Sequence, residues 1–291
     1  MTWNIVRWVW QLEAPLYLGM PPAGSLNRCR LYVPARAVHG ALAAEFARAK
    51  VDDNASRPPD YGKLGYELGN QCRFTYLYPA QQVGSDYQPW LPLFTNEHGL
   101  CWSRLDRQTE PLPDRHFRRR LLDTRPGVSI APQSDSAADG QLWETECLSQ
   151  WWRAPDSRQE TPEPVFLLGY VFLKDGAFQR CLHECNVLFL GGDTRYGFGK
   201  IRQINWLPLT GDHRVFEASV THCVAGPVLC TKRILGHEKV CPQATNDKRH
   251  GKQEIVGGWN INSVLEDGLS WAPGSKTEGD ACWSIDRFGY W

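Results

Sequence analysis

The 291-residue chain has no long apolar run and no excess of charge of either sign. Its longest apolar stretch near the middle, residues 165–173, spans nine residues, whereas a membrane-spanning helix needs about 20. Thirty-two basic and 32 acidic side chains give a formal charge of zero, which excludes a wholly cationic nucleic-acid binder and leaves only local basic patches. Arg7 and Glu13 interrupt the region where an export signal needs continuous apolar sequence. We therefore expect a cytoplasmic protein with no membrane partner.

The ten cysteines contain no Cys-x2-Cys pair, so the clearest sequence signature of a zinc site is missing. In the cytoplasm most of these thiols are expected to be reduced, as small buried hydrophobic residues or as metal ligands. We expect no cofactor. The alternative is a structural zinc ion in the segments HCVAGPVLC and HEKVC, which bring together His222, Cys223, Cys230, His237 and Cys241. Cys223, Cys230, His237 and Cys241 are the candidate ligands.

The sequence is rich in aromatic residues, including 13 tryptophans, and these gather in segments that read as strands. In residues 2–12, Trp8, Trp10 and Leu12 share one face of a predicted strand. Residues 72–80, CRFTYLYPA, alternate in the same way, and residues 164–176 form an apolar strand that ends at Asp175-Gly176. A short strand, LYVP, is expected to end at Pro34.

Two segments read as helices. Val38, Leu42 and Phe46 recur at helical spacing in residues 35–50, and AFQRCLHECNVLFL, residues 177–190, is a second, short helix. The order of elements predicts an α+β, ferredoxin-like fold with helices on one face of the sheet. We assign residues 1–96 and 164–215 to this core, 97–163 to a partly mobile insertion, and 216–291 to a β-rich C-terminal extension.

The sharpest local motif is LGGDTRYGFGKI, residues 190–201, which we expect to follow the second helix directly. Gly191, Gly192, Gly197 and Gly199 allow backbone conformations that other residues avoid, so that main-chain N–H groups could approach an anion closely. Arg195 and Lys200 add charge, and Tyr196 and Phe198 offer rings for stacking. In this segment the expected order is helix, glycine loop, strand. Loops that bind nucleoside triphosphates have the reverse order, strand, glycine loop, helix, so the motif does not match them. The alternative is a tight connection that binds nothing.

This loop resembles the glycine-rich loop of the RAMP superfamily of CRISPR-associated proteins. The segment LEAPLYLGMPPAGSLNRCRLYVPARAVHGALAAEFAR resembles the family's first strand, Gly/Ser loop and entry to the first helix, and RFTYLYPA is compatible with its next strand. The resemblance implies an RRM-related, ferredoxin-like fold that binds CRISPR RNA within a multisubunit ribonucleoprotein. Arg36 and His39, at the start of the first helix, join the glycine loop as implied RNA-binding residues.

Two positions bear on catalysis. In family members that cut target RNA, the loop before the first helix carries an aspartate, whereas GMPPAGSLNRCR contains Asn27 and no carboxylate. His39 stands where the family often has arginine, and a helical histidine could serve as the general base of an RNA-processing endonuclease. The alternative for His39 is a partly buried structural histidine. We expect a subunit without catalytic residues, with His39 as the candidate if it is an enzyme.

A basic cluster, RHFRRR, contains Arg118, Arg119 and Arg120. It interleaves arginines with an aromatic ring, a pattern suited to RNA phosphates, and its alternatives are a solvated loop or a docking site for a neighbouring subunit. Together these features predict a non-catalytic, CRISPR RNA-binding subunit of a type III-like antiviral effector. Its implied partners are CRISPR RNA, target RNA through the complex, other RAMP subunits and the large polymerase-like subunit.

The C-terminal segment GGWNINSVLEDGLSWAPGSKTEGDACW loosely resembles the end of handle-capping subunits, which favours binding of the 5′ handle of CRISPR RNA over a repeated backbone position. Two alternatives remain: an RNA-processing endoribonuclease that uses His39, and a metal-stabilised interaction subunit.

Overall fold

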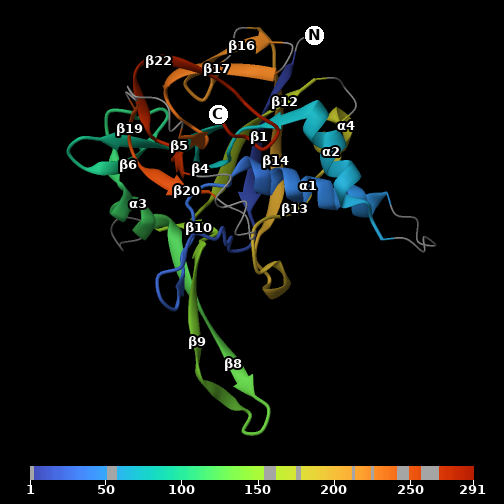
Figure 1. The fold of residues 1–291 in the computed structure, drawn as a ribbon, viewed down its shortest axis with the longest axis vertical. Helices are drawn as coiled ribbons and strands as arrows, with labels where there is room; N and C mark the ends of the chain where they lie inside the picture. Colours follow the sequence, from blue (N-terminus) through green and yellow to red (C-terminus); the bar gives the residue numbers. More distant parts are fainter. Residues whose placement is uncertain are drawn as a thin grey trace.

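Strands far outnumber helices in this protein (Figure 1). The computed structural model describes residues 3–50, 58–153, 162–174, 178–211, 214–223, 226–240, 249–256 and 269–291. In these ranges the helices are α1 (Ala35–Ala49), α2 (Tyr61–Gln71), α3 (Asp114–Leu121), α4 (Gln179–Glu184) and the 3-10 turn η1 (Thr194–Tyr196). None of them is long and apolar enough to cross a membrane. The predicted mixture of helices and strands is confirmed.

The largest sheet among the described residues is antiparallel and has nine strands. Its order is β13-β14-β1-β12-β4-β5-β6-β7, with β3 paired to β12. The bounds are β13 (Val187–Phe189), β14 (Lys200–Leu209), β1 (Asn4–Leu12), β12 (Phe166–Leu173), β4 (Tyr78–Val83), β5 (Asp86–Thr95), β6 (Gly99–Arg104), β7 (Leu112–Pro113) and β3 (Cys72–Phe74). Strands β1 and β12, distant in sequence, are neighbours in the middle of the sheet.

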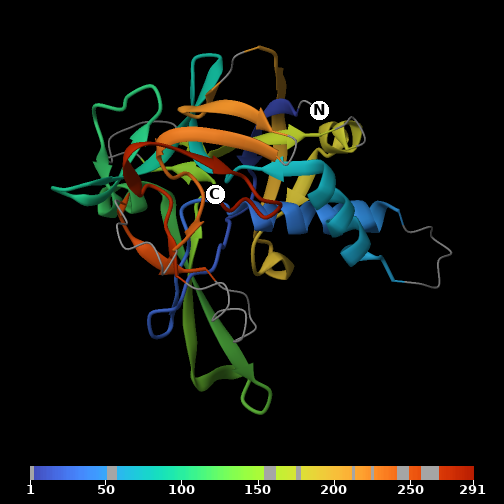
Figure 2. The same cartoon turned by 45° about the horizontal axis from the view of Figure 1, so that its top comes forward.

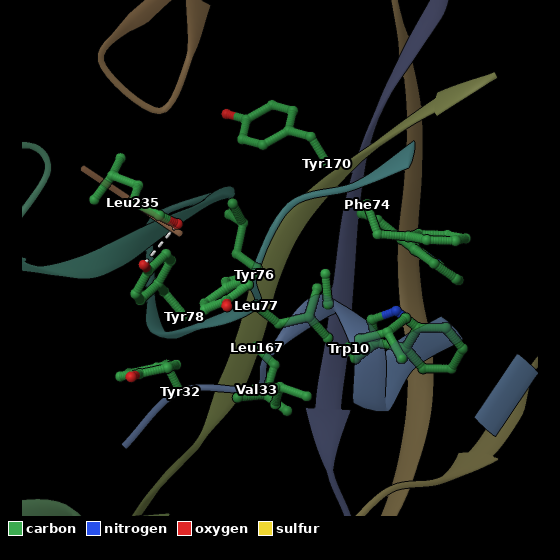
Figure 3. Close-up of a cluster of buried hydrophobic side chains, with 14 of the residues drawn as sticks. Trp10, Tyr32, Val33, Phe74, Tyr76, Leu77, Tyr78, Leu167, Tyr170 and Leu235 are labelled. Carbon is green, nitrogen blue, oxygen red and sulfur yellow. Dashed lines mark hydrogen bonds between the residues drawn. The ribbon is translucent and has the colours of Figure 1, made fainter. Parts of the chain in front are cut away.

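Both faces of the two middle strands are buried. Trp8 and Trp10 lie on one face of β1, as their alternation predicts, with ring centroids 4.8 Å apart. Val9, on the opposite face, is buried as well, and so is every residue of β12. Figure 3 shows the side chains of this core: Trp10 and Phe74 lie on one side of the ribbon, and Tyr170, Tyr76 and Tyr78 on the other. Burial on both faces explains why β12 is a continuous apolar run.

The C-terminal residues form two further sheets, of order β15-β16-β17-β22-β19 and β18-β21-β20. An aromatic pair and a hydrogen bond join them to the core. The rings of Tyr170 and Phe216 meet edge to face with centroids 4.9 Å apart, and the Tyr78 hydroxyl donates to the Leu235 carbonyl (Figure 3). The bounds are β15 (Arg214–Val215), β16 (Ala218–Cys223), β17 (Gly226–Arg233), β18 (Glu238–Lys239), β19 (Arg249–His250), β20 (Gln253–Ile255), β21 (Leu269–Trp271) and β22 (Lys276–Ser284).

A long hairpin of β8 (Leu122–Ala131) and β9 (Ser136–Leu148) projects from the body of the molecule in both ribbon views (Figures 1 and 2). Its base is held by β2 (Leu26–Asn27), which runs parallel to β9. Next to it, β10 (Trp151–Trp152) pairs with β11 (Glu163–Pro164). Ile130 and Leu142 lie exposed on the projecting part.

The structure corrects several element boundaries. The second predicted helix ends at Glu184, and β13 follows it because residues 187–189 pair with β14. Helix α2 was not predicted, although Leu64 and Leu68 are buried at helical spacing and Asp60 caps its first turn. Residues 72–80 split into β3 and β4, and LYVP contributes one isolated bridge rather than a strand. The main sheet also continues past residue 97, where we expected the insertion to begin, because β6 pairs with β5.

Candidate nucleic-acid interface

The glycine loop, residues 190–199, connects β13 to β14 and carries η1 at its tip. Gly191, Gly197 and Gly199 have φ angles of 79°, 85° and 80°, in the left-handed region that residues with a Cβ avoid. A Cβ on Gly191 would overlap the Tyr17 carbonyl oxygen, and one on Gly199 would overlap that of Leu190. The predicted need for glycine is therefore confirmed at these positions: all three have a positive φ, and close backbone packing adds to it at Gly191 and Gly199.

Several main-chain N–H groups of the loop are used within the protein. Gly192 N–H donates to the Tyr17 carbonyl at 3.0 Å, and Gly199 N–H donates to the Pro15 carbonyl at 2.7 Å. At η1, Tyr196 N–H donates to the Asp193 carbonyl and Gly197 N–H donates to the Thr194 carbonyl. Since these four donors are occupied, they do not form the anion cradle that the sequence suggested. They make the loop a rigid platform anchored on the segment that follows β1.

The loop presents side chains to solvent instead. The Tyr196 ring is 82% exposed at the tip of η1, and Arg195 and Asp193 beside it are exposed too. On β13, Phe189 is 49% exposed, whereas Phe198 is half-buried. An exposed aromatic ring next to a guanidinium can stack a nucleobase and contact its phosphate. The loop geometry thus favours recognition through Arg195 and Tyr196.

Lys200 and Arg202 at the start of β14 share one carboxylate. Lys200 Nζ lies 2.9 Å from Glu13 Oε2, and Arg202 pairs with Glu13 Oε1. Hydrogen bonds from Arg202 and Lys200 hold the pKa of the Glu13 carboxyl below its ordinary value. Two cations facing one carboxylate leave a positive surplus at the base of the loop, where an incoming phosphate can bind.

His39 and Arg36 lie on α1. Arg36 is exposed near the start of the helix, whereas His39 is buried between α1 and α2, with Nε2 2.9 Å from the Gly65 carbonyl oxygen. Burial is the main cause that lowers the pKa of the imidazole, and Arg287 and Arg73 add to it. A neutral imidazole has the correct charge for a general base, but the ring is buried and contacts a carbonyl of the protein. Its surroundings are those of a structural histidine.

Arg118, Arg119 and Arg120 of RHFRRR lie on α3, not in an irregular loop, and have different surroundings. Arg118 Nε lies 3.1 Å from Asp114 Oδ2, and its Nη1 lies 3.6 Å from Glu146. The Arg120 guanidinium sits over the Trp90 and Trp152 rings, 5.6 Å from each centroid, while Arg119 is exposed. Figures 1 and 2 show α3 and the strand that leads to the glycine loop on opposite sides of the hairpin base. The two predicted RNA-contacting regions are therefore separate.

Of the residues proposed as zinc ligands, Cys230 and His237 lie within the described residues and have other partners. Cys230 is in a disulfide bond with Cys282, so its sulfur is not a metal ligand in this structure. His237 is buried among Tyr76, Tyr32 and Glu254. The Cys223 side chain and all of Cys241 lie outside the described residues. In the described part of the chain, no group of three or more His, Cys, Asp or Glu residues could hold a metal ion.

Asn27, in the segment before α1 that contains no carboxylate, lies on β2. Its Nδ2 is 3.4 Å from Thr145 Oγ1 on β9, a long contact at the base of the projecting hairpin. The side chain is half-buried. Asn27 thus contributes to how the hairpin is attached to the core.

No family model and no curated protein matches this chain. Among solved structures, one chain from the cryo-EM structure of the Type III-B Cmr-beta bound to cognate target RNA and AMPPnP, state 1, is 11% identical with a TM-score of 0.54; the match covers 93% of this chain and 85% of that one. The two chains share an overall fold. A chain from the apo state of the Type III-B Cmr-beta gives a TM-score of 0.39 at 12% identity, over 69% of this chain and 96% of that one.

Sequence reasoning missed a second cluster of aromatic residues at α1, α2 and the C-terminal tail. Tyr61, Tyr66 and Phe288 are each at least 40% exposed and line one hollow with His39. The signal was present in YGKLGYELGNQ, where two tyrosines stand five residues apart among glycines. The sequence analysis assigned no helix or strand to this segment, whose glycines lower its helix propensity.

Proposed function

We propose that this chain is a non-catalytic, RNA-binding subunit of a type III CRISPR ribonucleoprotein effector, which acts in antiviral defence. The observation that carries the proposal is the fold shared with a chain of the Type III-B Cmr-beta structure bound to cognate target RNA. The RAMP-like segments of the sequence point independently to the same class. The implied partners are CRISPR RNA, target RNA reached through the complex, further RAMP subunits and the large polymerase-like subunit.

The core of this subunit is proposed to be ferredoxin-like. The antiparallel order β14-β1-β12-β3 places the first and third strands of a βαββαβ unit in the middle. Helix α1 connects the first strand to the second, and α4 connects the third to the fourth. That is the strand order of a split βαβ fold, and it supports the RRM-related assignment that the glycine loop suggested.

RNA is proposed to bind at the glycine loop through side chains. Tyr196 offers a solvent-exposed ring, Arg195 offers a guanidinium, and Lys200 and Arg202 outnumber the one carboxylate between them. We place this subunit at the 5′ handle of the CRISPR RNA because its C-terminal segment resembles that of handle-capping subunits. Arg119 is a further candidate contact, and His39 is proposed to be structural rather than catalytic.

The test is RNA binding by the full chain and by the complex assembled with its neighbours. Tyr196→Ala should weaken binding of CRISPR RNA about 5- to 150-fold, since one base–aromatic stack contributes about 1–3 kcal/mol. Arg195→Gln should weaken binding and reduce its salt dependence. Fluorescence anisotropy with a labelled RNA that carries the handle measures both effects.

Tyr196→Phe is the matched control, because it keeps the ring and removes only the hydroxyl. It should bind RNA like the wild type. The two substitutions Tyr196→Ala and Arg195→Gln can also be combined in one chain. If that double variant folds and still binds handle RNA with wild-type affinity, the glycine loop is not part of the RNA site. Purification of the chain without any CRISPR RNA or effector subunits from its native host would overturn the proposed class.

A further inference from the structure

A hollow of about 450 Å³ lies between α1 and α2 and is closed on one side by the C-terminal tail. No residue of the glycine loop lines it. The volume falls in the range of small-molecule sites, which are about 300–1,000 Å³. The lining residues on the two helices are either small or ring-bearing: His39, Gly40, Ala43, Ala44, Tyr61, Gly62, Gly65 and Tyr66. Arg287 and Phe288 complete it from the tail.

Small residues create the space, and aromatic rings border it. Gly40 and Gly62 have no Cβ, so the two helix surfaces leave room where other residues would place side chains. Tyr66 is 64% exposed, Tyr61 48% and Phe288 40%. Large rings gathered around one hollow and left open to water mark a binding surface more often than scattered exposed hydrophobic residues do. The exposed parts of these rings are therefore accessible to a flat ligand.

The charge of the hollow has one sign. Among the described residues that line it, Arg287 is the charged side chain and none is a carboxylate. The Arg287 guanidinium is exposed and lies 5.1 Å from the Phe288 ring centroid, so a cation and an aromatic face stand side by side. His39 forms the buried floor and is held against Gly65. An apolar, ring-lined hollow with one guanidinium at its edge is complementary to a flat, negatively charged ligand.

We propose that this hollow binds a nucleotide, with the base stacked on Tyr66 and Phe288 and the phosphate on the Arg287 guanidinium. The inference goes beyond the glycine-loop interface, shares no residue with that loop, and does not depend on it. The same chemistry is offered by a free nucleotide and by an unpaired nucleotide of an RNA strand, and the two are separated by the probes below. A basic protein segment is disfavoured, since no described residue of the lining is a carboxylate that could pair with it.

The experiment measures binding of two probes, adenosine monophosphate and a single-stranded RNA hexamer, to the full chain. Tyr66→Ala and Arg287→Gln should each weaken binding of at least one probe, with a loss of about 5- to 150-fold for the stacking ring. Tyr66→Phe keeps the ring and should bind like the wild type. Arg180→Gln is the matched charge control, because Arg180 is an exposed arginine on α4 that pairs with Glu184.

Each outcome decides the inference. Loss of monophosphate binding assigns the hollow to a free nucleotide, and loss of hexamer binding alone assigns it to a nucleotide within RNA. If both variants fold and bind both probes like the wild type, the nucleotide site is overturned, even where Tyr196→Ala still reduces RNA affinity. Failure of the Tyr66 and Arg287 variants to join their neighbouring subunits, with unchanged affinity for both probes, would overturn it in favour of a protein contact.

Discussion

The Tyr76 hydroxyl lies 2.6 Å from Nδ1 of His237, although 161 residues separate the two in the chain. His237 Nε2 is 2.6 Å from Glu254 Oε1, which also pairs with Arg30 at 2.6 Å. Burial opposes ionisation of Glu254, but the hydrogen bond from His237 and the Arg30 guanidinium hold its pKa below the ordinary range. This buried network joins the loop before α1, the middle of the core and the C-terminal extension.

Replacement of His237 should flatten the acid dependence of stability. Burial lowers the pKa of His237 from 6.5, so between that value and its folded pKa the unfolded chain binds a proton that the folded chain does not. Stability is therefore fully present above about pH 6.5 and falls as the pH drops below it. His237→Gln should reduce this slope by up to about 1.4 kcal/mol per pH unit. Urea unfolding between pH 7.5 and 5 measures it.

The control for this experiment is His98→Gln, since His98 is half-exposed and next to Glu97. That variant should follow the wild-type pH profile. The depressed pKa of Glu254 acts in the same direction at lower pH, below about 4.5, so both curves should fall there. Parallel curves for His237→Gln and wild type between pH 6.5 and 5 would contradict the assignment.

Two glycines of the loop should respond differently to alanine. Gly197 and Gly199 both have positive φ, which costs an alanine about 1–2 kcal/mol. A Cβ at Gly197 meets nothing within 4 Å, whereas one at Gly199 overlaps the Leu190 carbonyl. Gly197→Ala should therefore fold normally with a small loss of stability, and Gly199→Ala should lose several times more. Thermal unfolding of the pair checks this, and equal losses would show that the loop can shift.

Three arginines of α3, Arg118, Arg119 and Arg120, should separate into one surface residue, Arg119, and two structural ones. Arg119 is exposed, so Arg119→Ala should leave stability unchanged and, if it contacts a phosphate, reduce the slope of log affinity against log salt by about 0.7. Arg120→Ala should reduce stability by about 0.5–2 kcal/mol because it removes cation–π contacts with Trp90 and Trp152. RNA titrations at several salt concentrations, together with urea unfolding, measure both. A destabilised Arg119 variant would refute this division.

The disulfide between Cys230 and Cys282 should stabilise the C-terminal sheet. It joins neighbouring strands β17 and β22 across 52 residues of chain, and a link of this kind contributes about 2–4 kcal/mol. Cys230→Ser combined with Cys282→Ser should lower the unfolding midpoint, and dithiothreitol should lower that of the wild type by a similar amount. Cys181→Ser, at an exposed free thiol, is the control. A wild-type midpoint unaffected by reductant would show that the bond adds no stability.

Local periodicity was enough to predict α1, the faces of β1 and the apolar strand β12. The spacing of Val38 and Leu42 and the alternation of Trp8 and Trp10 are set by the helix and strand repeats themselves. The positive φ angles of Gly191, Gly197 and Gly199 could also be anticipated, because a dense run of glycines signals backbone that other residues avoid. These features need no knowledge of distant contacts.

Tertiary structure decided the surroundings of the charged and polar residues. Glu146 and Trp152 lie about 30 residues from Arg118 and Arg120 in sequence, yet they determine that these arginines are paired or stacked. The Gly65 carbonyl, on a helix that the sequence did not reveal, makes His39 a buried residue. A guanidinium or imidazole gains its role from the groups that surround it after folding, since burial and nearby charge set its pKa and its partners. Sequence periodicity alone placed β1, β12, the first helix and the glycine loop. The packing of distant segments decided which side chains remain open to a ligand.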